Sequence, residues 1–235
     1  MLGRGNSETG IKIYLEAALT ADSFAVTTSA IAADFVPIAY EFVSQAYSLY
    51  EEAPTESKAQ HRCISSMVGT LLALRSLSKE DYESLITKTA QFSAKVMKKP
   101  DQCELVALCA HLFYPASQGD KMKYSNPQRA LECLQRSLKL ADACTSASPS
   151  NLGLFVDLLE HYVYFFEKKN PVIKAAYITG LIALIKEHCS NLSSFGGDSS
   201  SVSDVKAQFL EVVRYINQKK AEGATAEMFA SIQVQ

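Results

Sequence analysis

The sequence predicts an all-α protein built from antiparallel helix pairs. Apolar residues recur at intervals of three and four positions through almost the whole chain, which is the spacing of one face of an α-helix. No sustained alternation of apolar and polar residues indicates a half-buried strand. The chain has 235 residues, of which 48% are hydrophobic, so it can form a sizeable core; its 10 Gly and 7 Pro are too few for a disordered chain.

The first three helices are predicted from the residues that separate them. A charge-free segment at residues 23–33 follows the first helix and is predicted to be a loop or a frayed helix end. A second helix should open near Pro37, because proline lacks the N–H that the first turn leaves unpaired. Pro54 should end this helix, and Thr55 should cap a third helix that runs to about Ser76.

The next two helices meet at a pair of lysines. Ser78 and Asp81 form a box-like cap for the fourth helix, and the carboxylate suits the positive end of the helix dipole. This helix is predicted to end at residues 98–99, because basic side chains favour a helix C-terminus. Pro100 should then start the fifth helix, and Pro115 should end it.

Start signals continue in the second half of the chain. Asn-Pro pairs at residues 126–127 and 170–171 predict the starts of the sixth and eighth helices, and Ser150 or Asn151 should cap the seventh. The side chains predicted to face the core along the chain include Ile11, Leu15, Val43, Ala46, Cys63, Met67, Leu71, Leu134, Ala141, Phe155, Leu159, Ile173, Tyr177, Ile185, Phe209 and Ile216.

The C-terminal part begins with a change in composition. Residues 190–203 are rich in Ser and Gly and are predicted to form a flexible loop. A ninth helix should follow near residues 204–220, and Thr225 should cap a short terminal turn. The predicted organisation is therefore helical repeats over residues 1–189, the loop, and a C-terminal helix and tail over residues 204–235.

The spacing of the helix starts predicts a repeat architecture. Alternate helices recur at roughly 45 to 50 residues, close to the period of HEAT-like helix pairs. Stacking of such pairs gives an elongated, curved α-solenoid of about nine helices, with a concave and a convex surface. A globular nine-helix bundle is the alternative architecture.

Charge and cysteine usage narrow the function classes. The net charge of −2 gives no overall basic excess, so nucleic acid is not indicated as a partner. The six cysteines contain no Cys-x-x-Cys pair and are predicted to be reduced, cytosolic thiols packed as small apolar residues. The longest run without Asp, Glu, Lys or Arg, residues 105–119, is too short and too polar to span a bilayer.

The sequence predicts no catalytic, cofactor or metal site. None of the four histidines follows a Glu or Asp by three residues, as metal-binding helix bundles usually require, and there is no His-Glu-x-x-His motif. A Gly-rich phosphate loop and a Gly-x-Ser-x-Gly motif are also missing. An all-α enzyme would need a cluster of acids or histidines that converge only in space.

Two groups of residues near the fifth helix are candidates for contact with another protein. Lys98 and Lys99 with Asp101 form a charged patch, either as a simple helix-end arrangement or as polar contacts at the rim of an interface. Phe113 and Tyr114 come just before a proline, where aromatic side chains either close a core or anchor an interface.

A third candidate group lies in the seventh helix, which has four aromatic residues in five positions. Tyr162 and Phe166 share one face, whereas Tyr164 and Phe165 are rotated away from it. One of these faces must meet either the next repeat or another protein.

Five stretches of the chain carry a resemblance to a known family: IKIYLEAALTAD (11–22), AYEFVSQAYSLYEEAPTESKAQ (39–60), KKPDQCELVALCAHLFY (98–114), ALECLQRSLKLAD (130–142) and LFVDLLEHYVYFFEKKN (154–170). With the spacers between them they cover most of residues 11–187, and KKPDQ and CAHLF are the more specific motifs. On these residues the chain resembles the C-terminal region of the large α-solenoid subunit of retromer, the vacuolar protein sorting protein 35 family.

The resemblance implies a non-enzymatic scaffold of HEAT-like helix pairs, without a cofactor. In the family, the concave face of the C-terminal solenoid holds a smaller, metallophosphoesterase-like subunit, and the assembled coat with its other proteins sorts transmembrane cargo. The implied location is cytoplasmic and peripheral on endosomal membranes, reached only through partners. The partner-binding residues that we expect on the matched stretches are Lys98, Lys99, Asp101, His111, Phe113, Tyr114, Tyr164 and Phe165.

An alternative function is that of a generic helical-repeat adaptor that binds peptides or another protein. An adaptor of the tetratricopeptide kind would show a period of about 34 residues, and the observed spacing does not favour it.

Overall fold

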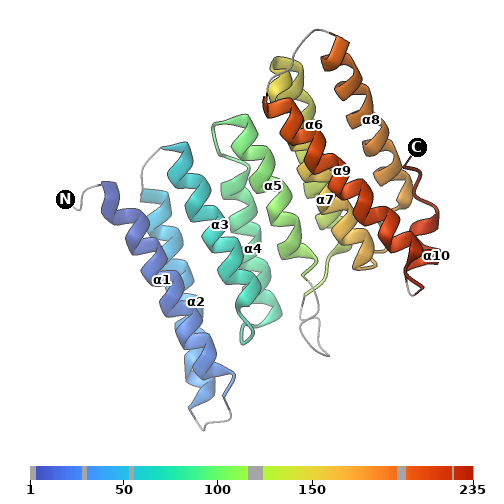
Figure 1. The fold of residues 1–235 in the computed structure, drawn as a ribbon. Coiled ribbons are helices and arrows are strands. Elements are labelled where there is room, and N and C mark those ends of the chain that lie inside the picture. The colour runs from blue at the N-terminus through green and yellow to red at the C-terminus, as the bar shows by residue number, and fades with distance from the viewer. Residues whose placement is uncertain are drawn as a thin grey trace. The chain divides into compact units, whose positions relative to one another are not determined.

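The computed structural model describes residues 4–27, 31–52, 56–115, 124–194, 200–223 and 225–234. These residues form ten α-helices and one short 3₁₀ helix, and no strand occurs among them (Figure 1). The predicted all-α solenoid class is therefore confirmed, with one helix more than the nine expected. The chain divides into two compact units, Met1–Asn126 and Pro127–Gln235.

The first unit is a two-layered stack of five helices. These are α1 (Arg4–Ala25), α2 (Ala32–Glu52), α3 (Ser57–Ala73), α4 (Lys79–Ser93) and α5 (Lys99–Phe113). Helices α1, α3 and α5 pack side by side as one layer, and α2 and α4 pack against each other as the second. Each consecutive pair runs antiparallel, which is the arrangement of HEAT-like repeats (Figure 1).

The second unit is arranged around a central helix. Its elements are α6 (Pro127–Ala147), the 3₁₀ helix η1 (Pro149–Leu152), α7 (Gly153–Glu167), α8 (Ala175–Ser194), α9 (Ser200–Ala221) and α10 (Ala226–Ala230). Helix α7 contacts α6, α8 and α9, and the short α10 packs against α9. Helices α7 and α9 are thus alternate helices that lie side by side.

The core of the first unit contains one buried polar cluster between the helices of its second layer. The hydroxyl of Tyr47 on α2 lies 2.5 Å from the hydroxyl of Thr89 and 3.2 Å from the carbonyl oxygen of Leu85, both on α4. Thr89 in turn donates to the Leu85 carbonyl. Burial strongly raises the pKa of Tyr47, so the phenol is neutral and every polar atom in this cluster is paired.

A buried carboxylate fixes the turn between α3 and α4. Asp22 of α1 accepts hydrogen bonds from the backbone N–H groups of Arg75 and Ser76 and from the Ser76 hydroxyl, at 2.6–3.1 Å. These bonds turn the chain away from the helix axis. Helix α3 consequently ends at Ala73 rather than near Ser76 as predicted.

The predicted start of the second helix is wrong. Helix α2 begins at Ala32, so Pro37 lies inside it rather than in its first turn, while α1 ends at Ala25, within the segment predicted to be a loop or a frayed helix end. The rings of Phe24 and Phe35 stack with centroids 5.3 Å apart, and this packing holds the end of α1 against the start of α2. Tertiary contact here overrides the local preference of proline.

Signals at the next helix ends give a mixed result. Thr55, the predicted cap of α3, lies outside the described residues, and Glu56 occupies the cap position without a side-chain hydrogen bond. The cap at Ser78 is confirmed, because its hydroxyl accepts from the backbone N–H of Asp81 at 3.0 Å. Pro127 is the first residue of α6, as predicted.

The second unit departs from prediction around α8. The side-chain oxygen of Asn170 accepts from the backbone N–H of Val172 at 3.1 Å and closes a turn, so α8 starts at Ala175 instead of Pro171. Of the side chains predicted to face the core here, Ile173 and Ile185 are buried, whereas Tyr177 is 40% exposed and the neighbouring Ile178 is fully buried.

The predicted loop at residues 190–203 is shorter than expected. Helix α8 runs to Ser194 and α9 begins at Ser200, so both helices enter the segment. Residues 195–199 lie outside the described residues, and flexibility there stays a prediction.

Candidate partner-binding surface

The predicted charged patch lies at the α4–α5 junction. Helix α4 ends at Ser93, so the two lysines do not complement its C-terminus as predicted. Lys98 is instead the N-cap of α5 and Lys99 its first residue, with the carboxylate of Asp101 in the same turn. The buried amide of Gln102, which donates to the Ala94 carbonyl, satisfies the end of α4 in their place.

Both lysine side chains at this junction are exposed, and Asp101 is half-buried. Lys99 donates to the side-chain oxygen of Gln102 at 2.9 Å, and Asp101 accepts from the hydroxyl of Ser57 on α3 at 2.5 Å. Lys98 and Lys99 are therefore available for contact, while Asp101 also ties α5 to α3.

The expectation that Phe113 and Tyr114 lie on the surface is wrong. Phe113 is 1% exposed and Tyr114 is 8% exposed, so both belong to the core. The backbone N–H of Asn126 donates to the carbonyl of Phe113 at 2.7 Å, so Asn126 lies at the end of α5. His111, one turn earlier on α5, is half-buried.

The aromatic pair of α7 separates into a core residue and a surface residue. Phe165 is fully buried, which contradicts its predicted place on the surface. Tyr164 is half-buried and packs edge-on against Phe165, with ring centroids 5.2 Å apart. The ammonium group of Lys168 lies 5.6 Å from the centre of the Tyr164 ring.

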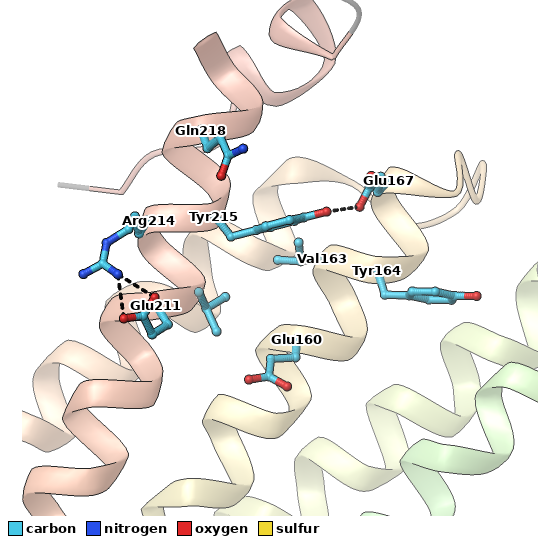
Figure 2. A pocket seen from close by; sticks show the side chains of 9 residues that line it. Glu160, Val163, Tyr164, Glu167, Glu211, Arg214, Tyr215 and Gln218 are labelled. Carbon is cyan, nitrogen blue, oxygen red and sulfur yellow. Dashed lines mark hydrogen bonds and ion pairs between the residues drawn. The ribbon is translucent and has the colours of Figure 1, made fainter. Parts of the chain in front are cut away.

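Tyr164 borders a groove between α7 and α9, the α7/α9 groove, with a volume of about 480 Å³. Figure 2 shows Tyr215 of α9 reaching across it to Glu167 of α7, whereas the ring of Tyr164 points away from α9. From α7 come Glu160, Val163, Tyr164 and Glu167, and from α9 come Glu211, Val212, Arg214, Tyr215 and Gln218. Their spacing of three and four residues is that of two facing helical stripes.

The groove has an apolar floor. Val163 and Val212 are buried, while Tyr215 remains 38% exposed. The ring of Tyr215 reaches from α9 towards α7, and its hydroxyl donates to Glu167 at 2.6 Å (Figure 2). Lys219 lies 5.4 Å from the centre of the same ring and 3.5 Å from the Glu167 carboxylate, so the ring is held in position.

The charged groups around the floor are paired unequally. Arg214 donates to both carboxylate oxygens of Glu211 at 2.6 Å. At the other end of the α7 stripe, Glu160 and Asp157 both accept from the side-chain amide of Gln208, at 3.0 and 2.9 Å. An amide carries no charge, so it does not neutralise these two carboxylates.

Two tyrosine pKa values are shifted at the groove. Burial, with the hydrogen bond to Glu167 as a further cause, raises the pKa of Tyr215. Burial also raises the pKa of Tyr164. Both phenols therefore stay neutral at physiological pH, and neither is suited to act as a base there.

Most residues of this groove are not predicted from the sequence. The aromatic cluster of the seventh helix indicates Tyr164, but no motif indicates Tyr215, Glu167 or Glu160. The usable signal was the repeat pattern itself: alternate helices of a solenoid lie side by side, so the exposed stripes of the seventh and ninth helices should face a common groove.

Within the described residues, no group of three or more His, Cys, Asp or Glu is placed to hold a metal ion. No helix in this part of the chain is long and apolar enough to cross a bilayer.

Comparison with known proteins identifies the family. The family model for vacuolar protein sorting-associated protein 35 matches residues 2–188. The chain is 39% identical to the Schizosaccharomyces pombe protein of that name over 146 residues, 62% of this chain and 17% of the relative. It is 37% identical to protein 35B of Arabidopsis thaliana over 222 residues, 92% of this chain and 26% of the relative.

A second Arabidopsis thaliana relative, protein 35A, is 36% identical over 233 residues, which are 97% of this chain and 27% of the relative. The chain thus spans about a quarter or less of the length of these relatives, as expected for one region of the whole protein. On the match to residues 2–188, the chain belongs to the vacuolar protein sorting-associated protein 35 family.

Proposed function

We propose that this chain is a non-enzymatic scaffold region of the retromer endosomal sorting coat. In this role its helical surface binds the metallophosphoesterase-like subunit and so supports retrieval of transmembrane cargo from endosomes to the Golgi and the plasma membrane. Attachment to the cytoplasmic side of endosomal membranes would come through partner proteins.

The observation that carries this proposal is the stacking of helix pairs in the first unit of a chain that matches the family over residues 2–188. Helices that lie side by side in a layer form a long surface to which another folded protein can bind. Such binding needs no cofactor. Stable interfaces bury about 1,600 Å² in total, which needs several helices on one side.

Five of the predicted contact residues remain candidates for this interface. Lys98 and Lys99 are exposed, while Asp101, His111 and Tyr164 are half-buried. Phe113, Tyr114 and Phe165 are core residues, so we expect them to support the surface from beneath rather than to touch a partner.

Co-elution tests the proposed function. The 235-residue chain is mixed with the purified metallophosphoesterase-like subunit and separated by size exclusion, with an unrelated metallophosphoesterase of similar size as the control. We expect a shared peak with the retromer subunit only. Separate elution at about 10 µM of each protein, a concentration at which a standard-size interface should hold, would contradict the proposal.

A charge-reversal variant tests the contribution of the α4–α5 junction. Lys98→Glu combined with Lys99→Glu should weaken the complex roughly five-fold, because exposed ion pairs each contribute up to about 1 kcal/mol. Lys139→Glu, at an exposed position of α6, is the matched control and should leave the affinity unchanged. If the unchanged chain, the double variant and Lys139→Glu bind with equal affinity, Lys98 and Lys99 are not part of the interface.

The alternative function, an adaptor that binds peptides, is favoured by one specific observation, the α7/α9 groove.

A further inference from the structure

We propose that the α7/α9 groove docks a short segment of a partner protein that carries a large apolar side chain and, three or four residues away, a lysine or arginine. This inference goes beyond the proposed scaffold function, because it assigns a second kind of partner and does not require the metallophosphoesterase-like subunit.

The apolar requirement comes from the floor of the groove. The volume of about 480 Å³ has room for a large apolar side chain and the backbone beside it. Such a side chain would contact Val163, Val212 and the exposed part of the Tyr215 ring. Apolar pockets with a few placed polar groups are the usual form of peptide-binding and ligand-binding sites.

The requirement for a lysine or arginine in the partner comes from the unequal pairing of charged side chains in the groove. Arg214 neutralises Glu211, and Lys219 lies beside Glu167. In contrast, no lysine or arginine of the described residues forms an ion pair with Glu160 or Asp157, which share only the amide of Gln208. A cation from the partner would be the missing counter-charge at this end of the groove.

A nearby histidine does not supply this counter-charge. Burial lowers the pKa of His161, although Asp157 acts in the opposite direction. The imidazole is therefore neutral at physiological pH, and the two carboxylates keep their excess negative charge.

The spacing between the two requirements follows from helix geometry. Glu160 precedes Val163 by three residues, so the carboxylate lies about 5 Å along the helix axis from the apolar floor. A partner segment that runs along the groove must place its cation at a similar distance from its apolar side chain. This sets the interval of three or four residues for a helical segment.

Contacts within the chain hold one wall of the groove in place. Tyr215 is bonded to Glu167 and covered by Lys219, so binding need not order this ring first (Figure 2). A site whose walls are already held in place loses less entropy when it binds, which favours even a small ligand.

A peptide series on the full 235-residue chain tests the proposal. The probes are fluorescein-labelled, helix-favouring peptides of twelve residues with one central leucine and arginine, glycine or glutamate four positions away. Fluorescence anisotropy gives the dissociation constants. We expect the arginine peptide to bind about ten-fold more tightly than the glutamate peptide, with the glycine peptide between them.

The matched variants are Glu160→Gln in the groove and Glu187→Gln at an exposed position of α8. Glu160→Gln should weaken binding of the arginine peptide about five-fold and leave the glycine peptide unchanged, whereas Glu187→Gln should change neither. Both side chains are exposed, so thermal melting should show that both variants fold normally.

Three results would overturn the proposal. These are equal affinity for the arginine and glutamate peptides, an unchanged affinity of Glu160→Gln for the arginine peptide, and no saturation by any peptide at about 1 mM, the weakest affinity that would count as docking. Self-association of the chain that Glu160→Gln abolishes would also overturn it, because a second copy would then occupy the groove. Co-elution with the metallophosphoesterase-like subunit is a separate measurement, so either hypothesis can fail alone.

Discussion

Tyr47 in the first unit and Tyr215 in the second each join two helices through a phenol hydroxyl. Tyr47 connects α2 to Thr89 and Leu85 of α4 and is 1% exposed. Tyr215 connects α9 to Glu167 of α7 and is 38% exposed. The same residue type thus closes a core between one pair of helices and lines an open groove between another.

The two tyrosines differ in what would fill the space and pair the remaining polar atoms if the side chain were removed. Around Tyr47 there is only protein, so removal leaves a cavity and unpaired polar atoms, and both are costly. Around Tyr215, water can reach the Glu167 carboxylate and restore its hydrogen bonds. An inter-helix hydrogen bond therefore stabilises the fold strongly in the first setting and weakly in the second.

The largest effect that sharpens this comparison is expected for Tyr47→Ala. Truncation of a fully buried aromatic side chain should lower the free energy of unfolding by about 3–5 kcal/mol. Urea denaturation followed by circular dichroism measures this change. Tyr47→Phe is the matched control, since it keeps the ring and should lose only about 1 kcal/mol.

A loss below about 1 kcal/mol for Tyr47→Ala would mean that α2 and α4 can close over the missing ring. Tyr47 and Tyr215 would then contribute to the free energy of unfolding to a similar extent.

The next largest effect is expected for Asp22→Ala, at the other buried polar cluster of the first unit. The substitution leaves the backbone N–H groups of Arg75 and Ser76 without their acceptor, which should lower the free energy of unfolding by about 2–3 kcal/mol. Hydrogen exchange at these two amides gives a local measurement, and we expect their protection to be lost.

Asp22→Asn is the matched variant, because its single carbonyl oxygen can still accept from these donors. If Asp22→Ala and Asp22→Asn destabilise the protein equally, the loss comes from the charge and not from the hydrogen bonds.

Some residues that act within one turn could be predicted from the sequence. Ser78 caps α4 through the N–H of Asp81, and Pro127 opens α6, because both effects depend only on neighbouring backbone. Pro37 shows the limit of this reasoning: its local preference for a helix start is weaker than the packing of Phe24 on Phe35.

The faces of the helices were harder to predict than their starts. Phe113 and Phe165 were expected on the surface and are in the core, because a helix in a repeat array is covered on more than one side. Tyr164, next to Phe165, does border the groove. One position along a helix rotates a side chain by about 100°, so small errors in phase exchange core and surface.

The smallest effect that tests the comparison is expected for Tyr215→Phe. The substitution removes one hydroxyl at the edge of the groove, and water can take its place beside Glu167, so the free energy of unfolding should change by less than about 0.5 kcal/mol. The measurement is the same urea titration as for Tyr47→Phe, so the two hydroxyls are compared under one condition.

If Tyr215→Phe lowers the free energy of unfolding as much as Tyr47→Phe does, exposure does not determine how much such a hydrogen bond stabilises the fold. The packing of α7 against α9 would then depend on this contact. If only Tyr215→Phe causes a small loss, the hydroxyl contributes little to folding stability. Its role would then be to hold the ring in position for binding at the groove.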